Sequence, residues 1–317
     1  MENTAPKLRI IYGDCTLGIK TNDKHYIFSY TRGGLESLKK HGKEWLYRET
    51  MPTFWRALTD NDRGSGFGYR SNMWLGAGLY PIVKGFTVRI NEEEIKQPTA
   101  PNNNQYSNEE YAKTAEIIFT LEINTVPQTV VDVAYFVQEN GDLRIKMTYH
   151  GQKGLPELPL LGLRFIMPTK AKHYEYEGLS GETYPDRKAG GIPGIYKVEG
   201  LPFPPYLVPQ DCGMHMDTKW LEITRDQTLN NADHSQEEFS LRFEKTTENF
   251  AFSALPFKAE ELENATHIEE LPPERRTVLT MLAKVRGVGG INSWGADVEA
   301  PFHISGEEDH EFSFTVK

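Results

Sequence analysis

A run of acidic and amide side chains is the first candidate for chemistry in this sequence. Residues 54–64 read FWRALTDNDRG, so an Asp-Asn-Asp run from Asp60 to Asp62 follows two aromatic residues and precedes a glycine-rich stretch. A helix-loop-helix calcium loop beginning at Asp60 would need glycine at its sixth position and glutamate at its twelfth. The sequence has Ser65 and Ser71 there. We therefore expect no metal, and the run forms either a turn, which Asp and Asn favour, or a shaped loop at a binding site.

Several carboxylates gather in residues 175–191, EYEGLSGETYPDRKAGG. Glycoside hydrolysis needs two carboxyl groups, one on each side of the scissile bond, and Glu177, Glu182 and Asp186 are the candidates here. Spacing along the chain does not give their separation in space. An aspartate beside an arginine, here Arg187, is more often part of a structural ion pair, so we favour a structural role for this stretch.

Two single residues are further candidates. His215, in PQDCGMHMDTKW, could exchange protons near neutral pH, but no partner is evident, and we expect a hydrogen-bonded loop histidine. Trp294 lies among glycines in RGVGGINSWGADVEAPF, which predicts a loop. Its ring could stack on the apolar face of a sugar, contributing roughly 2–3 kcal/mol for about 100 Å² covered, or it could close the end of the fold.

β-strands must position these residues, because alternation of apolar and polar residues dominates the chain. The alternation is clearest at residues 143–149, 239–243 and 312–316. Further strands are expected at residues 8–12, 26–30, 116–123, 129–138, 220–224, 251–254 and 278–285. Helix is expected at 258–265 and as a turn at 72–75, and irregular chain at 91–107 and 190–209. No linker is evident, so we expect a single domain over residues 1–317, a large antiparallel β-sandwich with long loops.

Composition narrows the classes of partner. The formal charge of −10 argues against nucleic acid, which needs a basic face. Cys15 and Cys212 are far apart and are expected to be free thiols in a reducing compartment. The N-terminal MENTAPKLRII lacks a signal-peptide pattern, and no apolar run approaches the roughly 20 residues of a membrane helix. We expect a cytoplasmic protein that does not enter a membrane.

Four stretches together resemble the C-terminal domain of the large β-galactosidases of glycoside hydrolase family 2, which several bacteria encode as a separate small chain. They are FWRALTDNDRG, GLSGETYPDRKAG, PYLVPQDCGMH and GVGGINSWG, in family order. The resemblance extends from about Leu8 to Val316, which makes the sequence look like a complete small chain. It implies an all-β fold, the galactose-mutarotase-like antiparallel β-supersandwich, in agreement with the strand pattern.

The resemblance also implies a division of labour between two chains. In the family, the reacting glutamates and the magnesium and sodium sites lie in a barrel domain, which this chain lacks. We therefore expect no catalytic residue, metal or cofactor here, a large catalytic subunit as partner, and a galactoside such as lactose as substrate of the assembled enzyme. Two departures, Ile291-Asn292 before Ser-Trp and Asp211 after Gln210, alter the family pattern.

Two family features map onto this chain. Trp294 matches a tryptophan that reaches the active-site mouth and packs against sugar. The segment from Asp60 to Ser71 matches a mobile loop beside that site. The loop residues expected to shape the sugar site are Asp60, Asn61, Asp62, Gly64, Ser65 and Gly66. In this interpretation Phe54 and Trp55 pack into the sandwich and hold the base of the loop.

Two other functions stay open. The fold is shared with aldose mutarotases, and a stand-alone mutarotase would use His215 with a carboxylate such as Glu182 as base and acid. A simple carbohydrate-binding module would use Trp294 without any large subunit.

Overall fold

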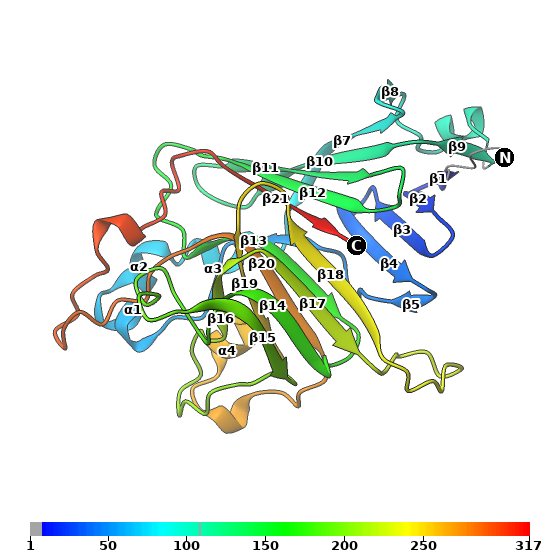
Figure 1. Ribbon diagram of the computed structural model, residues 1–317. Helices are drawn as coiled ribbons and strands as arrows, with labels where there is room; N and C mark the ends of the chain where they lie inside the picture. Colours follow the sequence, from blue (N-terminus) through cyan, green and yellow to red (C-terminus); the bar gives the residue numbers. More distant parts are fainter. Residues whose placement is uncertain (1–7, 108) are drawn as a thin grey trace.

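The computed structural model describes residues 8–107 and 109–317, and within these ranges the strands form three antiparallel sheets (Figure 1). The first, of six strands in the order β5-β4-β3-β2-β1-β9, comes mainly from the N-terminal part. Its strands are β1 (Leu8–Tyr12), β2 (Thr16–Lys20), β3 (Lys24–Ser29), β4 (Gly34–Lys40), β5 (Lys43–Glu44) and β9 (Glu110–Ala112). The all-β prediction with large antiparallel sheets is confirmed.

A ten-stranded sheet, in the order β15-β14-β17-β18-β21-β12-β11-β10-β7-β8, is the largest of the three. Residues alternate between buried and partly exposed along β10 and β11, so one face of the sheet covers the core. The strands are β7 (Ile82–Ile90), β8 (Glu93–Ile95), β10 (Ala115–Ile123), β11 (Thr129–Val137), β12 (Leu143–His150), β14 (His173–Leu179), β15 (Pro193–Glu199), β17 (Trp220–Arg225), β18 (Phe239–Lys245) and β21 (His310–Val316).

The five-stranded sheet, in the order β16-β19-β20-β13-β6, is the most deeply buried. All six residues of β19 are buried, as are the first six of β20, so both faces of these strands are covered. Its strands are β6 (Met51–Thr53), β13 (Leu160–Met167), β16 (Met214–Thr218), β19 (Phe250–Leu255) and β20 (Thr277–Val285).

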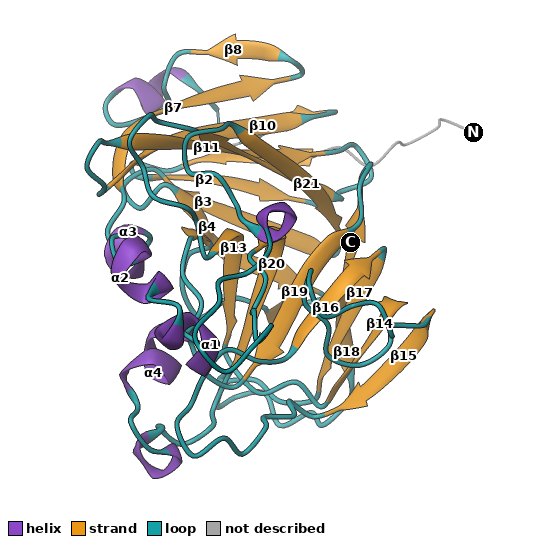
Figure 2. Ribbon diagram, turned by 90° about the vertical axis from the view of Figure 1, so that its left-hand side faces the viewer, coloured by secondary structure: helices purple, strands orange, loops and turns teal. Residues whose placement is uncertain are grey.

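Short helices gather on one side of the sheets, as Figure 2 shows. They are α1 (Asp60–Gly64), α2 (Phe67–Ser71), α3 (Trp74–Ala77) and α4 (Ala259–Asn264), with 3-10 turns at Asn102–Gln105, Ile268–Glu270 and Ala300–Phe302. The predicted helix at 258–265 is confirmed as α4. Among the described residues, no helix has the length and apolar character to cross a membrane.

The strand predictions are confirmed, and the two stretches expected to be irregular are mostly so, but each also contains one strand. Residues 190–209 contain β15 and residues 91–107 contain β8, each at an edge of the ten-stranded sheet. β15 pairs with β14 alone and tolerates Pro193, because an edge strand can lack one ladder donor. Both strands bury little apolar surface and so carry a weak pattern.

Both cysteines are free, Cys15 exposed and Cys212 buried. The first seven residues of the N-terminal stretch, for which no signal peptide was predicted, lie outside the described residues. The single domain over residues 1–317 stays a prediction.

Candidate functional site

The Asp-Asn-Asp run forms the first turn of a helix, so its prediction as a loop or turn is wrong. Thr59 caps α1: its Oγ1 accepts a hydrogen bond from the Asp62 backbone N–H at 3.2 Å. The Asp62 carboxylate in return accepts from the Thr59 backbone N–H at 2.9 Å. This reciprocal capping box satisfies two otherwise free donors. A second short helix, α2, follows after Gly66, so little of the Asp60–Ser71 segment is irregular.

The Asp62 carboxylate lies buried between two buried arginines. Asp62 and Arg286 are each 1% exposed in their side chains, and Arg56 is 0% exposed. Arg56 contacts Asp62 at 2.5 and 3.2 Å, and Arg286 contacts it at 3.3 Å. Arg286 also stacks over the ring of Phe67 in α2, 3.9 Å from its centroid. Because buried charges are costly unless paired, this cluster fixes α1 and α2 against the end of β20.

The same cluster holds the loop that carries Trp294. Arg286, which binds Asp62, also forms an ion pair with Asp297. Arg70 of α2 pairs with Asp297 too, and donates to the Ser65 carbonyl at 2.8 Å. Burial alone would raise the pKa of Asp297, but hydrogen bonding to Arg286 lowers it. The carboxylate is therefore charged and bridges the two segments.

Direct contacts between α1 and the Trp294 loop complete this link. Asn61 Nδ2 donates to the Val288 carbonyl at 3.1 Å. Gly295 has φ of +79° and packs so closely on α1 that a Cβ there would lie 2.4 Å from the Gly64 carbonyl oxygen. Only glycine fits this position. In Figure 1 the orange-red chain before the C-terminal strand runs beside α1 and α2.

Trp294 itself extends into solvent. The residue is 89% exposed, so its ring does not close the end of the sandwich. The loop is shaped by Asn292, whose Oδ1 accepts from the backbone N–H groups of Trp294 at 2.9 Å and Ala296 at 3.3 Å. These hydrogen bonds shape a loop that presents a bare indole to solvent, and an indole face suits stacking on a sugar.

The side chains of Asp186 and Arg187 do not form the expected ion pair, although Arg187 donates to the Asp186 backbone carbonyl at 3.0 Å. The Asp186 carboxylate accepts from the backbone N–H of Val288 at 2.9 Å and of Gly289 at 2.8 Å. Arg187 donates to the Gly289 carbonyl. Both residues therefore hold the start of the Trp294 loop, because its glycine-rich backbone exposes donors and acceptors that have no strand partner.

The remaining candidate carboxylates have structural partners. Glu177 accepts from Lys219 Nζ at 2.5 Å and from Trp220 Nε1 at 3.0 Å. Glu182 accepts from the Gly213 backbone N–H at 2.7 Å. With Asp186 on the loop backbone, all three act as acceptors for fixed donors.

His215 lies on strand β16, not in a loop as predicted, and it is 5% exposed. Its Nδ1 donates to the Gly181 carbonyl at 2.9 Å, and its Nε2 accepts from the Tyr174 hydroxyl at 3.1 Å. The ring stacks on Phe252. Burial lowers the pKa of His215 to about 4, so the ring is neutral near pH 7. Both ring nitrogens are engaged, an arrangement that does not favour a mutarotase.

Phe54 and Trp55 pack into the core as predicted, at 1% and 3% exposure. The arginines that organise the site were missed, although Arg56 stands between Trp55 and Ala57 and Arg286 directly follows a buried strand. An arginine inside an apolar run is a usable signal, because such a charge needs a buried partner. Among the described residues, no group of three or more His, Cys, Asp or Glu side chains could hold a metal.

Known proteins resemble this chain over its length. The family described as β-galactosidase small chain matches residues 20–316. The "Beta-galactosidase small subunit" of Latilactobacillus sakei is 54% identical over 316 residues, covering 100% of this chain and 99% of the relative. A "Beta-galactosidase" of Streptococcus thermophilus is 30% identical over 98% of this chain, which spans only 28% of that relative's length.

Among solved structures, a galactose mutarotase-like protein from Lactobacillus casei ATCC 334 matches 95% of this chain and 99% of its own, with 9% identity and a TM-score of 0.43. So distant a likeness supports no inference about activity. The match to the small-chain family is far stronger, because it spans nearly the whole sequence at high identity to one small subunit. The chain belongs to the β-galactosidase small chain family.

Proposed function

We propose that this chain is the small subunit of a two-chain β-galactosidase and completes the sugar site of a large catalytic subunit. The observation that carries the proposal is Trp294: an 89% exposed indole on a loop fixed by buried ion pairs. Removing the apolar surface of an exposed aromatic ring from water is favourable, and this requires another molecule to cover the ring. Sugar and the partner subunit would supply that cover, and family membership supports both.

The assembled enzyme would hydrolyse terminal β-galactosides such as lactose with retention of configuration, which needs two carboxyl groups about 5 Å apart. In this chain the candidate carboxylates Glu177, Glu182 and Asp186 are bound to fixed structural donors. We therefore assign the reacting glutamates, and the magnesium and sodium sites, to the large subunit. The small chain contributes to catalysis by positioning the substrate: the indole orients the sugar and excludes water from the contact between them.

The α1 segment would form the rim of the same site. Asp60 and Asn61 are exposed, whereas Asp62 is buried and anchors the helix. Gly64 ends α1, and Ser65 and Gly66 form the short connection to α2. In this proposal the exposed polar atoms of α1 face the sugar or the partner subunit. The buried cluster holds them at a fixed position relative to Trp294.

Separate purification of the two subunits tests the proposal. The small chain alone should not hydrolyse lactose, and mixing it with the large subunit should restore activity at a one-to-one ratio. Turnover by the isolated small chain would overturn the assignment of the reacting groups.

Polarimetry and sugar binding separate the two alternatives. Accelerated mutarotation of fresh α-galactose, abolished by His215→Ala, would favour a mutarotase. Sugar binding by the isolated chain that depends on Trp294, without association to a large subunit, would favour a binding module. The cytoplasmic location stays a prediction.

A further inference from the structure

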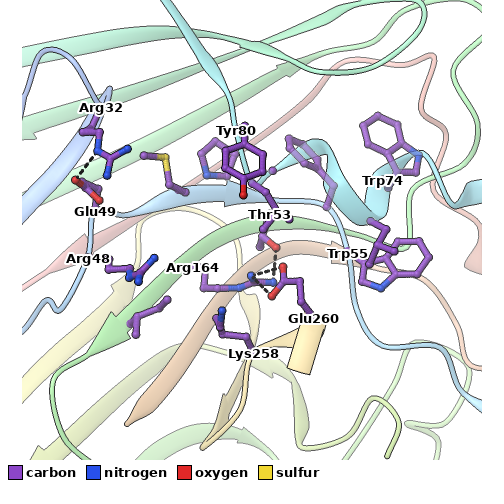
Figure 3. Close-up of a pocket in the computed structure, with 17 residues that line it drawn as sticks. Arg32, Arg48, Glu49, Thr53, Trp55, Trp74, Tyr80, Arg164, Lys258 and Glu260 are labelled. Atoms are coloured by element: carbon purple, nitrogen blue, oxygen red, sulfur yellow. Dashed lines mark hydrogen bonds and ion pairs between the residues drawn. The ribbon is translucent and has the colours of Figure 1, made fainter. Parts of the chain in front are cut away.

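A groove rich in positive charge lies beside the segment that leads into α1. Two adjoining hollows, of about 280 and 240 Å³, share Arg48, Ile166 and Lys258 in their walls. Figure 3 shows Arg48, Arg164 and Lys258 around the first hollow, with Tyr80 at its edge. We call the two hollows together the cationic groove. Its positively charged residues are Arg32, Arg48, Arg164, Lys258, Arg275 and Arg276.

Positive charge in the groove exceeds negative charge. Three carboxylates line it, those of Glu49, Glu260 and Glu261. Arg32 pairs with Glu49 at 3.2 Å, and Arg164 pairs with Glu260 at 2.8 Å.

Four of its cations have no carboxylate partner. Within residues 8–107 and 109–317, Arg48, Lys258, Arg275 and Arg276 form no ion pair. The third carboxylate, that of Glu261, accepts from the Lys258 backbone N–H at 2.8 Å and so caps α4. In a chain of net charge −10, a cluster of unpaired cations is an unusual concentration of the opposite sign.

The edges of the groove have the composition of a protein interface. Tyr80 is 79% exposed, Leu79 is 46% exposed and Tyr47 is 41% exposed. The guanidinium of Arg276 lies over the ring of Tyr47, 3.6 Å from its centroid, so both side chains are held in place. Tyrosine and arginine are enriched among the residues that contribute most to binding between proteins.

The shape of the groove favours an extended partner over a small anion. Arg164 lines only the first hollow, Arg275 only the second and Arg48 both, so the positive charges extend along the groove and do not enclose one point. A chain carrying several carboxylates could contact them in turn, with bidentate arginine pairs. Nucleic acid is disfavoured because the protein as a whole would repel it.

The groove also adjoins the proposed sugar site. Phe54 and Trp55 line its first hollow and continue along the chain into α1. Glu263 of α4 accepts from the Leu58 backbone N–H at 2.7 Å, which ties the helix beside the groove to that same segment. A partner bound in the groove would therefore be placed next to α1.

We propose that the cationic groove docks an acidic segment of the large subunit. This inference rests on the proposed function, because it needs a catalytic partner. The groove has no reacting role, so it should control how tightly the subunits associate and leave turnover of the assembled enzyme unchanged. Opposite charges across an interface speed association, and added salt screens this attraction and weakens binding.

The test is the affinity of the small chain for the large subunit, measured by titrating restored lactose hydrolysis at low and high salt. Arg48→Glu with Arg275→Glu should weaken association on the order of tenfold or more at low salt. It should also remove much of the salt dependence, and saturating small chain should reach the wild-type kcat. Arg275→Gln removes the positive charge without reversing it, so this variant should lose less affinity for the large subunit.

A matched control changes the net charge equally at another face. Lys20→Glu with Lys39→Glu alters two exposed lysines of the six-stranded sheet that have no ion pair among the described residues, and association should stay within about threefold of wild type. Thermal unfolding should be unchanged in every variant, since the altered side chains are exposed. Wild-type affinity in the Arg48 and Arg275 double variant, or an equal loss in the control, would overturn the inference while the proposed function stands. Absence of association by the wild-type chain would overturn both.

Discussion

Replacing Asp62 by asparagine should destabilise the protein severely and loosen the Trp294 loop. The carboxylate is 1% exposed and is the shared partner of Arg56 and Arg286, whose side chains are 0% and 1% exposed. Removing one partner of a buried ion pair costs about 3–5 kcal/mol, because the remaining charge is buried without compensation. Asparagine has one acceptor oxygen in place of two, so a hydrogen bond from Thr59 or from an arginine is also lost, which adds about 1 kcal/mol. These losses are a large part of the roughly 5–15 kcal/mol that stabilises a typical protein.

Asp60→Asn is the matched control, since it makes the same chemical change in the same helix. The Asp60 side chain is 80% exposed and its contact with Arg63 is 3.5 Å long, so the loss should stay within about 1 kcal/mol. Urea unfolding followed by tryptophan fluorescence measures both variants. In the assembled enzyme, Asp62→Asn should also raise KM for lactose, because Arg286 binds Asp297 as well. Equal unfolding midpoints for the two variants would refute the role given to the buried cluster.

Three further changes probe the same region. Gly295→Ala should lower kcat/KM of the assembled enzyme, since its methyl group would meet the Gly64 carbonyl at 2.4 Å. Gly76→Ala is the control: a methyl group there meets nothing within 4 Å, so the variant should behave as wild type in the same assay. Asp186→Ala frees two backbone donors of the Trp294 loop and should cost about 1–3 kcal/mol in urea unfolding; an unchanged midpoint would show that the clamp is unimportant. Burial raises the pKa of Asp211 from 3.8 to about 7, so its neutral form stabilises the fold at low pH, and this stability is lost as pH rises through about 7. Asp211→Asn should remove that fall. Between pH 5 and pH 8 the fall is at most about 3 kcal/mol, since about two pKa units at 1.36 kcal/mol each remain above pH 5, and it is smaller because the residue is half-buried. Thermal unfolding at pH 5 and pH 8 would reveal it, and an unaltered pH profile would contradict it.

Strands with one buried face were predictable because their pattern is local. Residues 143–149 alternate apolar and polar side chains, and β12 pairs with β11 and β21 over that length. β8 and β15 escaped prediction because edge strands bury too little to impose the alternation.

The site was only partly predictable for a related reason. Trp294 was expected in a loop from its flanking glycines, and it lies in one. The turn chemistry of Asp-Asn-Asp concealed a five-residue helix that is too short to show a 3.6-residue period. The role of Arg286 depends on Asp62, 224 positions away, so only the folded chain brings the pair together.

The central claim is that the indole of Trp294 forms part of a sugar site whose reacting groups belong to another subunit. The most direct test is to titrate a fixed amount of large subunit with wild-type, Trp294→Ala or Trp294→Phe small chain and to measure lactose hydrolysis. All three should saturate at the same ratio. Loss of about 2–3 kcal/mol of stacking predicts a kcat/KM about 30- to 150-fold lower for Trp294→Ala, with partial recovery in Trp294→Phe. Wild-type kcat/KM in the Trp294→Ala enzyme would contradict the account.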